Sequence, residues 1–161
     1  MDKQITFIND DIKNVDKIFD RESFDVVTCN PPYFKFKESS LININKGKAI
    51  ARHEVNLKLE DVISKANYLL KNGGTFALVH RPERFMEIIN LMQKYNLEPK
   101  RLRFVYPKKE KNANIILVEG IKNGKCGLKI EKPLVVYNKN NEYVDEVRKM
   151  FGGSEDVAEK L

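Results

Sequence analysis

The chain has 161 residues, 42% hydrophobic and 32% charged, with a formal net charge of +6 at pH 7. This length and composition indicate one globular domain with a core of its own, and no apolar run approaches the ~20 residues that cross a membrane. Two cysteines without metal-ligand spacing exclude a disulfide framework and point to no metal site, so we expect a reducing, cytoplasmic location. The positive charge favours a polyanionic partner.

The first predicted element is a strand over residues 4–9, followed by Asp10 and Asp11. Residues 12–19 form either a short helix or an irregular connection. The next strand covers residues 24–29. It is rich in β-branched residues and its apolar positions do not strictly alternate with polar ones, so we expect it to be buried on both faces.

Asn30-Pro31-Pro32-Tyr33 follows this strand directly. Proline fixes its own φ, restricts the residue before it and cannot donate to a sheet ladder, so the strand ends in a rigid elbow. Open α/β sheets bind ligands at the carboxyl ends of their strands. The four residues alone also suit an ordinary proline turn, but their place after a buried strand favours a site.

The elbow has the groups that an exocyclic amine requires. Such an amine is a poor nucleophile because its lone pair is delocalised. The side-chain oxygen of Asn30 and the backbone carbonyl of Pro31 are two acceptors that can orient an NH2 group, and Tyr33 offers a stacking face. We therefore assign Asn30, Pro31, Pro32 and Tyr33 to a catalytic site.

Helices alternate with strands in the rest of the chain. Residues 34–51 have weak periodicity, and we interpret them as a loop beside the site. The other expected elements are a helix over 57–70, a strand over 75–79, a helix from Pro82 to 95–96, strands over 102–106 and 114–120, an apolar segment over 134–137 and a helix over 143–151.

This order predicts an α/β fold with a mostly parallel sheet, helices on both faces and an antiparallel strand near the C-terminus. One domain would cover residues 1–153, and residues 154–161 would form a frayed tail.

Several basic and aromatic residues near the elbow are candidate RNA contacts. The interleaving of Phe36 with two lysines combines stacking with charge, although an aromatic that anchors the loop explains it equally well. Arg81 and Arg84 follow the strand at 75–79 and should face the same crevice. Alternatively, they are solvent-exposed residues at the start of a helix. The candidates are Lys35, Phe36, Lys37, Arg52, His53, Arg81 and Arg84.

A run of basic residues occupies positions 94–111, opposed by Glu98 and Glu110. Such a run is usually a solvated face, with nucleic-acid binding as the alternative. Its members are Lys94, Lys100, Arg101, Arg103, Lys108, Lys109 and Lys111.

The elbow resembles the Asn-Pro-Pro-Tyr motif of amino-methyltransferases that use S-adenosylmethionine. Over residues 3–152 the chain is similar to the bacterial tRNA (adenine-N6)-methyltransferases acting on valine tRNA, on the following segments: Ala51-Arg52-His53-Glu54, Leu70-Lys71-Asn72-Gly73-Gly74, Gly124-Lys125-Cys126-Gly127, Leu134-Val135-Val136-Tyr137 and Tyr143. The resemblance implies a Rossmann-like fold from its third strand onward, and methyl transfer from S-adenosylmethionine to an adenine amine in tRNA.

The resemblance also implies cofactor-binding residues. In this family an aspartate after the third strand, followed by an apolar residue, accepts a hydrogen bond from the adenine amine of the cofactor. Asp11 and Ile12 match this pattern, and Asn30 lies beside the cofactor. The alternative is that Asp10 and Asp11 cap the helix that follows.

The chain departs from the family at its beginning. Family members start with a strand, a Gly-rich loop, a helix and a second strand that ends in an acid, and no Gly-x-Gly occurs in this chain. We therefore expect an amino-terminally truncated enzyme with an incomplete cofactor site and little activity alone. The edge of the strand at 24–29 would be exposed, and either residues 4–9 or another chain would pair with it, which favours self-association.

Two alternatives remain. An amide presents a planar NH2 group similar to that of adenine, so the chain is also compatible with a glutamine-N5 methyltransferase of release factors. It is compatible, too, with a catalytically inactive RNA-binding or interaction fragment. The positive charge favours RNA.

Overall fold

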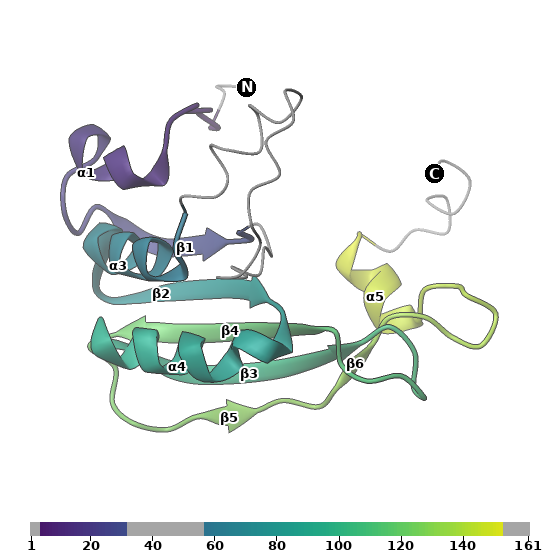
Figure 1. Ribbon diagram of the computed structural model, residues 1–161. Coiled ribbons are helices and arrows are strands. Elements are labelled where there is room, and N and C mark those ends of the chain that lie inside the picture. The colour runs from purple at the N-terminus through teal and green to yellow at the C-terminus, as the bar shows by residue number, and fades with distance from the viewer. Residues whose placement is uncertain (1–3, 32–56, 153–161) are drawn as a thin grey trace, which may run out of the picture.

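The computed structural model describes residues 4–31 and 57–152. The strands described form one sheet in the order β1-β2-β4-β3-β5, and β6 also pairs with β3 (Figure 1). Only β4 runs antiparallel to its neighbours. The predicted α/β fold with a mostly parallel sheet is therefore confirmed. The strands are β1 (Phe24–Cys29), β2 (Leu70–His80), β3 (Leu97–Tyr106), β4 (Ile115–Lys122), β5 (Lys129–Ile130) and β6 (Leu134–Val135).

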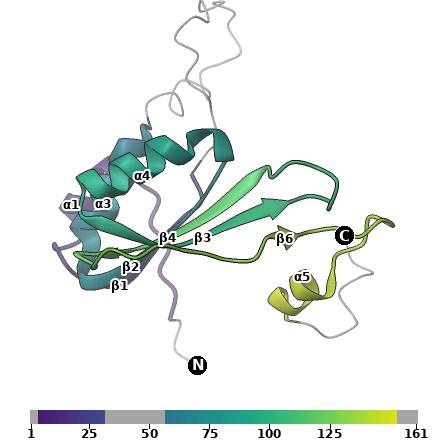
Figure 2. The same ribbon diagram turned by 90° about the horizontal axis from the view of Figure 1, so that it is seen from below.

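Helices lie on both faces of the sheet, but unequally. Figure 2 shows α3 and α4 on one side and α5 on the other, beside β6. Val147 of α5 packs with Val105 and Leu134 in a small separate cluster. The helical segments are η1 (Ile12–Asn14), α1 (Val15–Ile18), α3 (Leu59–Leu69), η2 (Pro82–Arg84), α4 (Phe85–Lys94) and α5 (Asp145–Met150).

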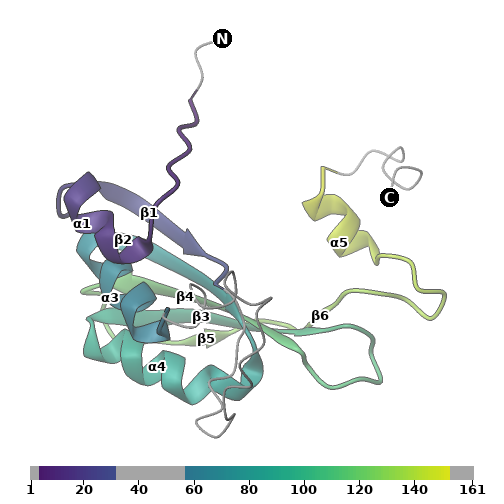
Figure 3. The same cartoon turned by 45° about the horizontal axis from the view of Figure 1, so that its top comes forward.

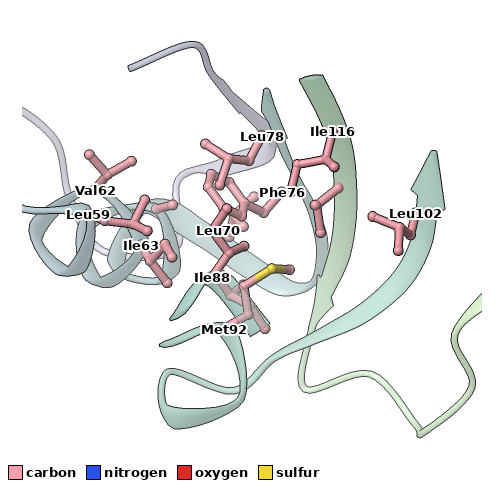
Figure 4. Packing of buried hydrophobic residues seen from close by; sticks show 13 residues of the cluster. Leu59, Val62, Ile63, Leu70, Phe76, Leu78, Ile88, Met92, Leu102 and Ile116 are labelled. Atoms are coloured by element: carbon pink, nitrogen blue, oxygen red, sulfur yellow. The ribbon is translucent and has the colours of Figure 1, made fainter. Parts of the chain in front are cut away.

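The main core lies between the sheet and the pair α3 and α4 (Figure 4). Apolar residues recur at helical spacing along α3, so one face of that helix is buried. Alternate residues of β2 point into the same core, because successive side chains of a strand lie on opposite faces. The fully buried members include Ile63, Leu70, Phe76, Ile88 and Met92. This core holds the strands whose ends form the candidate site.

β2 begins earlier than the sequence predicts. It starts at Leu70, directly after α3, and includes Asn72, Gly73 and Gly74, a turn-like sequence that follows the predicted helix. The register with β1 shifts there, because Phe24 is paired with Leu70 and Val26 with Thr75. A Cβ on Gly74 would meet the backbone oxygen of Lys71 at 2.9 Å, so glycine permits the close approach.

The expectation that β1 is buried on both faces is wrong. Val27 packs against the main core, whereas Val26 is 57% exposed. β1 is an edge strand, and its outward face receives no helix among the described residues. Its lack of alternation therefore reflects β-branched composition and not burial.

The predicted strand over residues 4–9 does not form. These residues have no regular secondary structure, and Figure 3 shows them as an extended segment that leads away from the sheet. Ile5 is 70% and Phe7 93% exposed. A strand needs a partner ladder, and within the described residues the outer edge of β1 pairs with none. The possibility that this segment pairs with β1 of its own chain is therefore wrong.

We propose that two copies associate through the outer edge of β1. An unpaired strand edge with apolar side chains promotes pairing, and a lysine on that strand opposes it. Val26→Lys is expected to convert a concentration-dependent dimer into a monomer in sedimentation velocity. Met86→Lys, at another exposed apolar position on α4, is the control and should leave the dimer intact. A wild-type protein that stays monomeric as its concentration rises would contradict the proposal.

Candidate functional site

The candidate site lies at the carboxyl ends of β1 and β2. These strands are parallel, and Cys29 of β1 is paired with Leu78 of β2. The residues that follow, Asn30-Pro31 and His80-Arg81, therefore lie next to each other at the same edge of the sheet. Asn30 is exposed and Pro31 is buried. The turn thus anchors its proline while presenting the asparagine at the surface.

The other sequence-predicted residues divide into two groups. Arg81 and Arg84, and the predicted cofactor-binding residues Asp11 and Ile12, lie within the described residues, and their surroundings are given below. The remaining candidates lie outside the described residues, so their roles stay predictions, and so does the expected tail at 154–161. Those residues are Pro32, Tyr33, Lys35, Phe36, Lys37, Arg52 and His53.

His80 is a buried polar residue at the end of β2, next to the predicted site residue Arg81. Only 2% of the residue is exposed. Its Nδ1 accepts a hydrogen bond of 2.8 Å from the backbone N–H of Arg81, so the neutral ring carries its proton on Nε2. Burial first, and then the positive charge of Arg84, lower the pKa of His80. The ring is therefore neutral at pH 7. The alternation of buried positions along β2 includes His80, and this spacing could have predicted its burial from the sequence.

Arg81 and Arg84 have different surroundings. Nη1 of Arg81 donates to the backbone oxygen of Asn114 at 3.1 Å, which links the end of β2 to the segment between β3 and β4. The guanidinium of Arg84 binds both carboxylate oxygens of Glu87, with Nε 2.6 Å from Oε2. The charge of Arg84 is therefore offset within the protein.

A hollow of about 440 Å³ crosses the sheet next to Asn30. Its lining includes Ala77 and Val79 of β2, half-buried positions that alternate with the core positions and so face away from α3 and α4. Three charged side chains of its wall pair with each other, because Arg101 lies 3.2 Å from Glu119 and 3.3 Å from Glu131. The hollow is thus an apolar sheet face bordered by ion pairs.

Asp11 and Ile12 lie at the start of η1. Asp11 is the N-cap residue, and its carboxylate accepts a hydrogen bond of 2.9 Å from the backbone N–H of Lys13. The capping role that the sequence left open is therefore observed. Asp11 is exposed and Ile12 is half-buried. Their assignment to cofactor binding stays a prediction.

Residues 4–31 and 57–152 offer neither a metal-binding cluster nor a membrane-spanning helix. No group of three or more His, Cys, Asp or Glu side chains in these ranges is arranged to hold a metal ion. None of the helices there has the length and apolar character needed to span a bilayer.

No family model matches the chain. Curated relatives named "tRNA1(Val) (adenine(37)-N6)-methyltransferase" match it in sequence. The relative from Porphyromonas gingivalis is 32% identical over 106 residues, which cover 66% of this chain and 40% of the relative. The relative from Aeromonas hydrophila is 26% identical over 135 residues, 83% of this chain and 55% of the relative. The chain thus spans about half the length, or less, of the curated relatives it matches.

Solved structures share the fold. A predicted O-methyltransferase from Agrobacterium tumefaciens superposes with a TM-score of 0.67 at 22% identity, over 88% of this chain and 60% of that one. A protein assigned as a DNA modification methylase from Thermus thermophilus, crystallised with S-adenosyl-L-methionine, gives a TM-score of 0.50 at 18% identity, over 86% of this chain and 56% of that one. The chain is therefore similar in sequence to part of the tRNA1(Val) (adenine(37)-N6)-methyltransferases and shares its fold with solved methyltransferase structures.

Proposed function

We propose that this chain is the substrate-binding part of an S-adenosylmethionine-dependent methyltransferase that modifies the N6 amine of an adenine in tRNA. The observation that carries the proposal is the position of Asn30, exposed at the carboxyl end of β1 and followed by the buried Pro31. Ligands of open α/β sheets bind at this edge.

The elbow acts on the amine by orienting it. The side-chain oxygen of Asn30 and the backbone carbonyl of Pro31 each accept one N–H of the adenine amine. Both N–H bonds are then held in place, and the nitrogen lone pair is turned out of conjugation with the ring. Tyr33 is proposed to stack on the adenine after the base has left its helical stack. Because the amine is already oriented when the substrate binds, less entropy has to be lost in reaching the transition state.

The described residues fit only part of the proposed cofactor. The exposed carboxylate of Asp11 and the half-buried Ile12 match the polar and apolar edges of an adenine ring. Residues 4–31 and 57–152 contain no Gly-x-Gly loop for the methionine end. When bound, S-adenosylmethionine supplies an activated methyl group on its sulfonium. We propose that the missing part of the site comes from outside this chain.

The choice of tRNA is supported by the names of the homologues and by the charge. Each of the relatives cited above is named for a tRNA adenine, and the net charge of +6 suits a polyanion. A tRNA substrate also agrees with the proposed cytoplasmic location.

The test is a methyl-transfer assay with S-adenosylmethionine labelled in its methyl group. The polypeptide as its gene encodes it is offered unmodified tRNA or a release factor, and the 161 residues alone are assayed beside it. The expected product is N6-methyladenosine in tRNA, identified by mass spectrometry of the nucleosides. The 161 residues alone are expected to show little turnover. Label on a glutamine of the release factor, or on neither acceptor, would contradict the proposal.

A further inference from the structure

The structure divides the basic run at 94–111 into paired and unpaired cations. Four of its seven members have partners within the protein. Arg101 pairs with Glu119 and Glu131 as described above. The other three interactions are Lys94 with Glu60 at 2.5 Å, Arg103 with Glu146 at 2.5 Å, and Lys100 Nζ with the backbone oxygen of Lys125 at 2.9 Å. The cationic groups of these four residues are therefore largely occupied by partners within the protein.

Lys108, Lys109 and Lys111 are the other three members. In the part of the chain that the structure describes, no carboxylate lies within ion-pair distance of their ammonium groups. Lys108 is half-buried, and Lys109 and Lys111 are exposed. Only Glu110, within the same turn, opposes them in sequence. The segment therefore carries a local excess of two positive charges at the surface.

These lysines sit on a well-built turn between β3 and β4. The backbone N–H of Lys111 donates to the oxygen of Lys108 at 3.0 Å, and Asn114 N–H donates to the oxygen of Val105 at 3.0 Å. From the other side, Tyr137 N–H donates to the oxygen of Pro107 at 3.0 Å. A turn fixed in this way presents its side chains with little further ordering on binding.

The turn lies at the same edge of the sheet as Asn30. β1 and β3 run in the same direction, with β2 and β4 between them, so their carboxyl ends point to the same edge of the sheet, and β3 extends further than β1 (Figure 1). Three strand spacings separate them across the sheet, about 14 Å at ~4.8 Å per strand. Along the strands the register puts Asn30 level with Arg103, so Lys108 lies a further roughly 16 Å away at ~3.3 Å per residue. Arg81 lies between, and its bond to the oxygen of Asn114 joins the end of β2 to the base of the turn.

We propose that the turn at Lys108–Lys111 binds the sugar-phosphate backbone of the RNA whose adenine is held at Asn30. This inference rests on the function proposed above and identifies where that RNA runs. Lysine side chains neutralise phosphates without reading sequence. The combined separation of roughly 21 Å corresponds to about six nucleotides at ~3.4 Å each along a stacked strand, so the turn contacts the strand on one side of the target base.

The test compares two triple variants that remove equal charge. Lys108, Lys109 and Lys111 are replaced by Gln in one, and Lys94, Lys100 and Lys125 by Gln in the other. The control positions lie at the opposite end of β3 and β4 or on α4. Binding to tRNA is measured over a salt series by fluorescence anisotropy. Each lost phosphate contact lowers the salt slope by ~0.7–0.9, so the turn variant should lose about two units of slope and the control almost none.

Steady-state kinetics give a second readout. The turn variant is expected to raise KM for tRNA about tenfold or more, while kcat stays within about twofold, because the lysines contribute equally to ground-state and transition-state binding. Equal losses in both triples, or none in the turn variant, would overturn the inference. If the turn triple fails to melt like wild type, Lys109→Gln with Lys111→Gln, both exposed, takes its place and should lose half or more of the same slope.

The outcomes separate this inference from the proposed function. A wild-type protein that methylates adenine in tRNA but is insensitive to the turn variant contradicts only the inference. Label that appears on a release factor, or on no acceptor, contradicts the proposed function whatever the turn variant does.

Discussion

Replacing Asn30 with alanine is expected to abolish methyl transfer to RNA without unfolding the protein. Alanine removes the side-chain oxygen that we propose accepts from the adenine amine, and loss of one such oriented contact costs at least about a hundredfold in kcat. Asn30 is exposed and follows the last residue of β1, so the core is untouched. The measurement is the initial rate with saturating tRNA, paired with a thermal melt.

Two further variants sharpen this prediction. Asn30→Asp keeps an acceptor oxygen at the same place and should retain most of the methyl-transfer rate. If Asn30 had only a structural role, the rate would not depend on whether the new side chain has an acceptor oxygen. Asn90→Ala removes an exposed amide from α4 and should change neither rate nor melting temperature. An Asn30→Ala protein with wild-type kcat would remove the elbow from the mechanism.

Replacing Lys122 with methionine is expected to destabilise the fold by about 3 kcal/mol, because buried acceptors that lose their donor cost 1–3 kcal/mol each. Only 3% of Lys122 is exposed. Its Nζ donates to the backbone oxygens of Asn67 at 2.9 Å and Leu70 at 2.7 Å, and to Glu22 Oε1 at 2.9 Å. One ammonium thus joins the end of β4, the C-terminal end of α3 and the turn before β1. Urea unfolding gives the free energy.

Lys125→Met is the matched control, because Lys125 is exposed three residues further on and its change should stay within about 0.5 kcal/mol. A similarly small change in the free energy of unfolding on Lys122→Met would refute the structural role of Lys122.

The pH dependence of stability gives a second check on Lys122. Hydrogen bonding to Lys122 lowers the pKa of Glu22 below its usual value of 4.5. A lowered folded pKa gives stability that is present above 4.5 and is lost as the pH falls through the folded value, so the difference between wild type and variant should narrow in acid by the part that Glu22 contributes.

Local sequence patterns predicted the elements that carry their own periodicity. The apolar spacing along α3 and α4 and the short run of β1 were sufficient to place them. Pairing was harder to predict. Residues 4–9 have strand composition, but a strand also requires a partner, and the described residues provide none for that segment. β1 was expected to be buried because its composition does not report which neighbours cover it.

The position of Asn30 and Pro31 at the end of β1 was predictable because one short segment carries the signal, and their chemical role stays a prediction. The site was not predictable where charge is neutralised over long separations. Lys94 finds its partner at Glu60 and Arg103 at Glu146, so the sequence shows a uniform basic run where the structure has two kinds of cation. His80 was missed for a related reason, since its burial comes from packing against other elements.

The central position of β4 has a consequence for how the chain folds as it is synthesised. β4 lies between β2 and β3 and pairs with both, and β2 and β3 do not pair with each other. Everything from β1 to β3 therefore leaves the ribosome before the strand that joins the two halves of the sheet. The nascent chain has to keep β2 and β3 apart until Lys122 has emerged. Lys122 is the last residue of β4 and donates hydrogen bonds at the end of α3. The residue that completes the joining strand therefore also fixes that strand to the helix that formed before it.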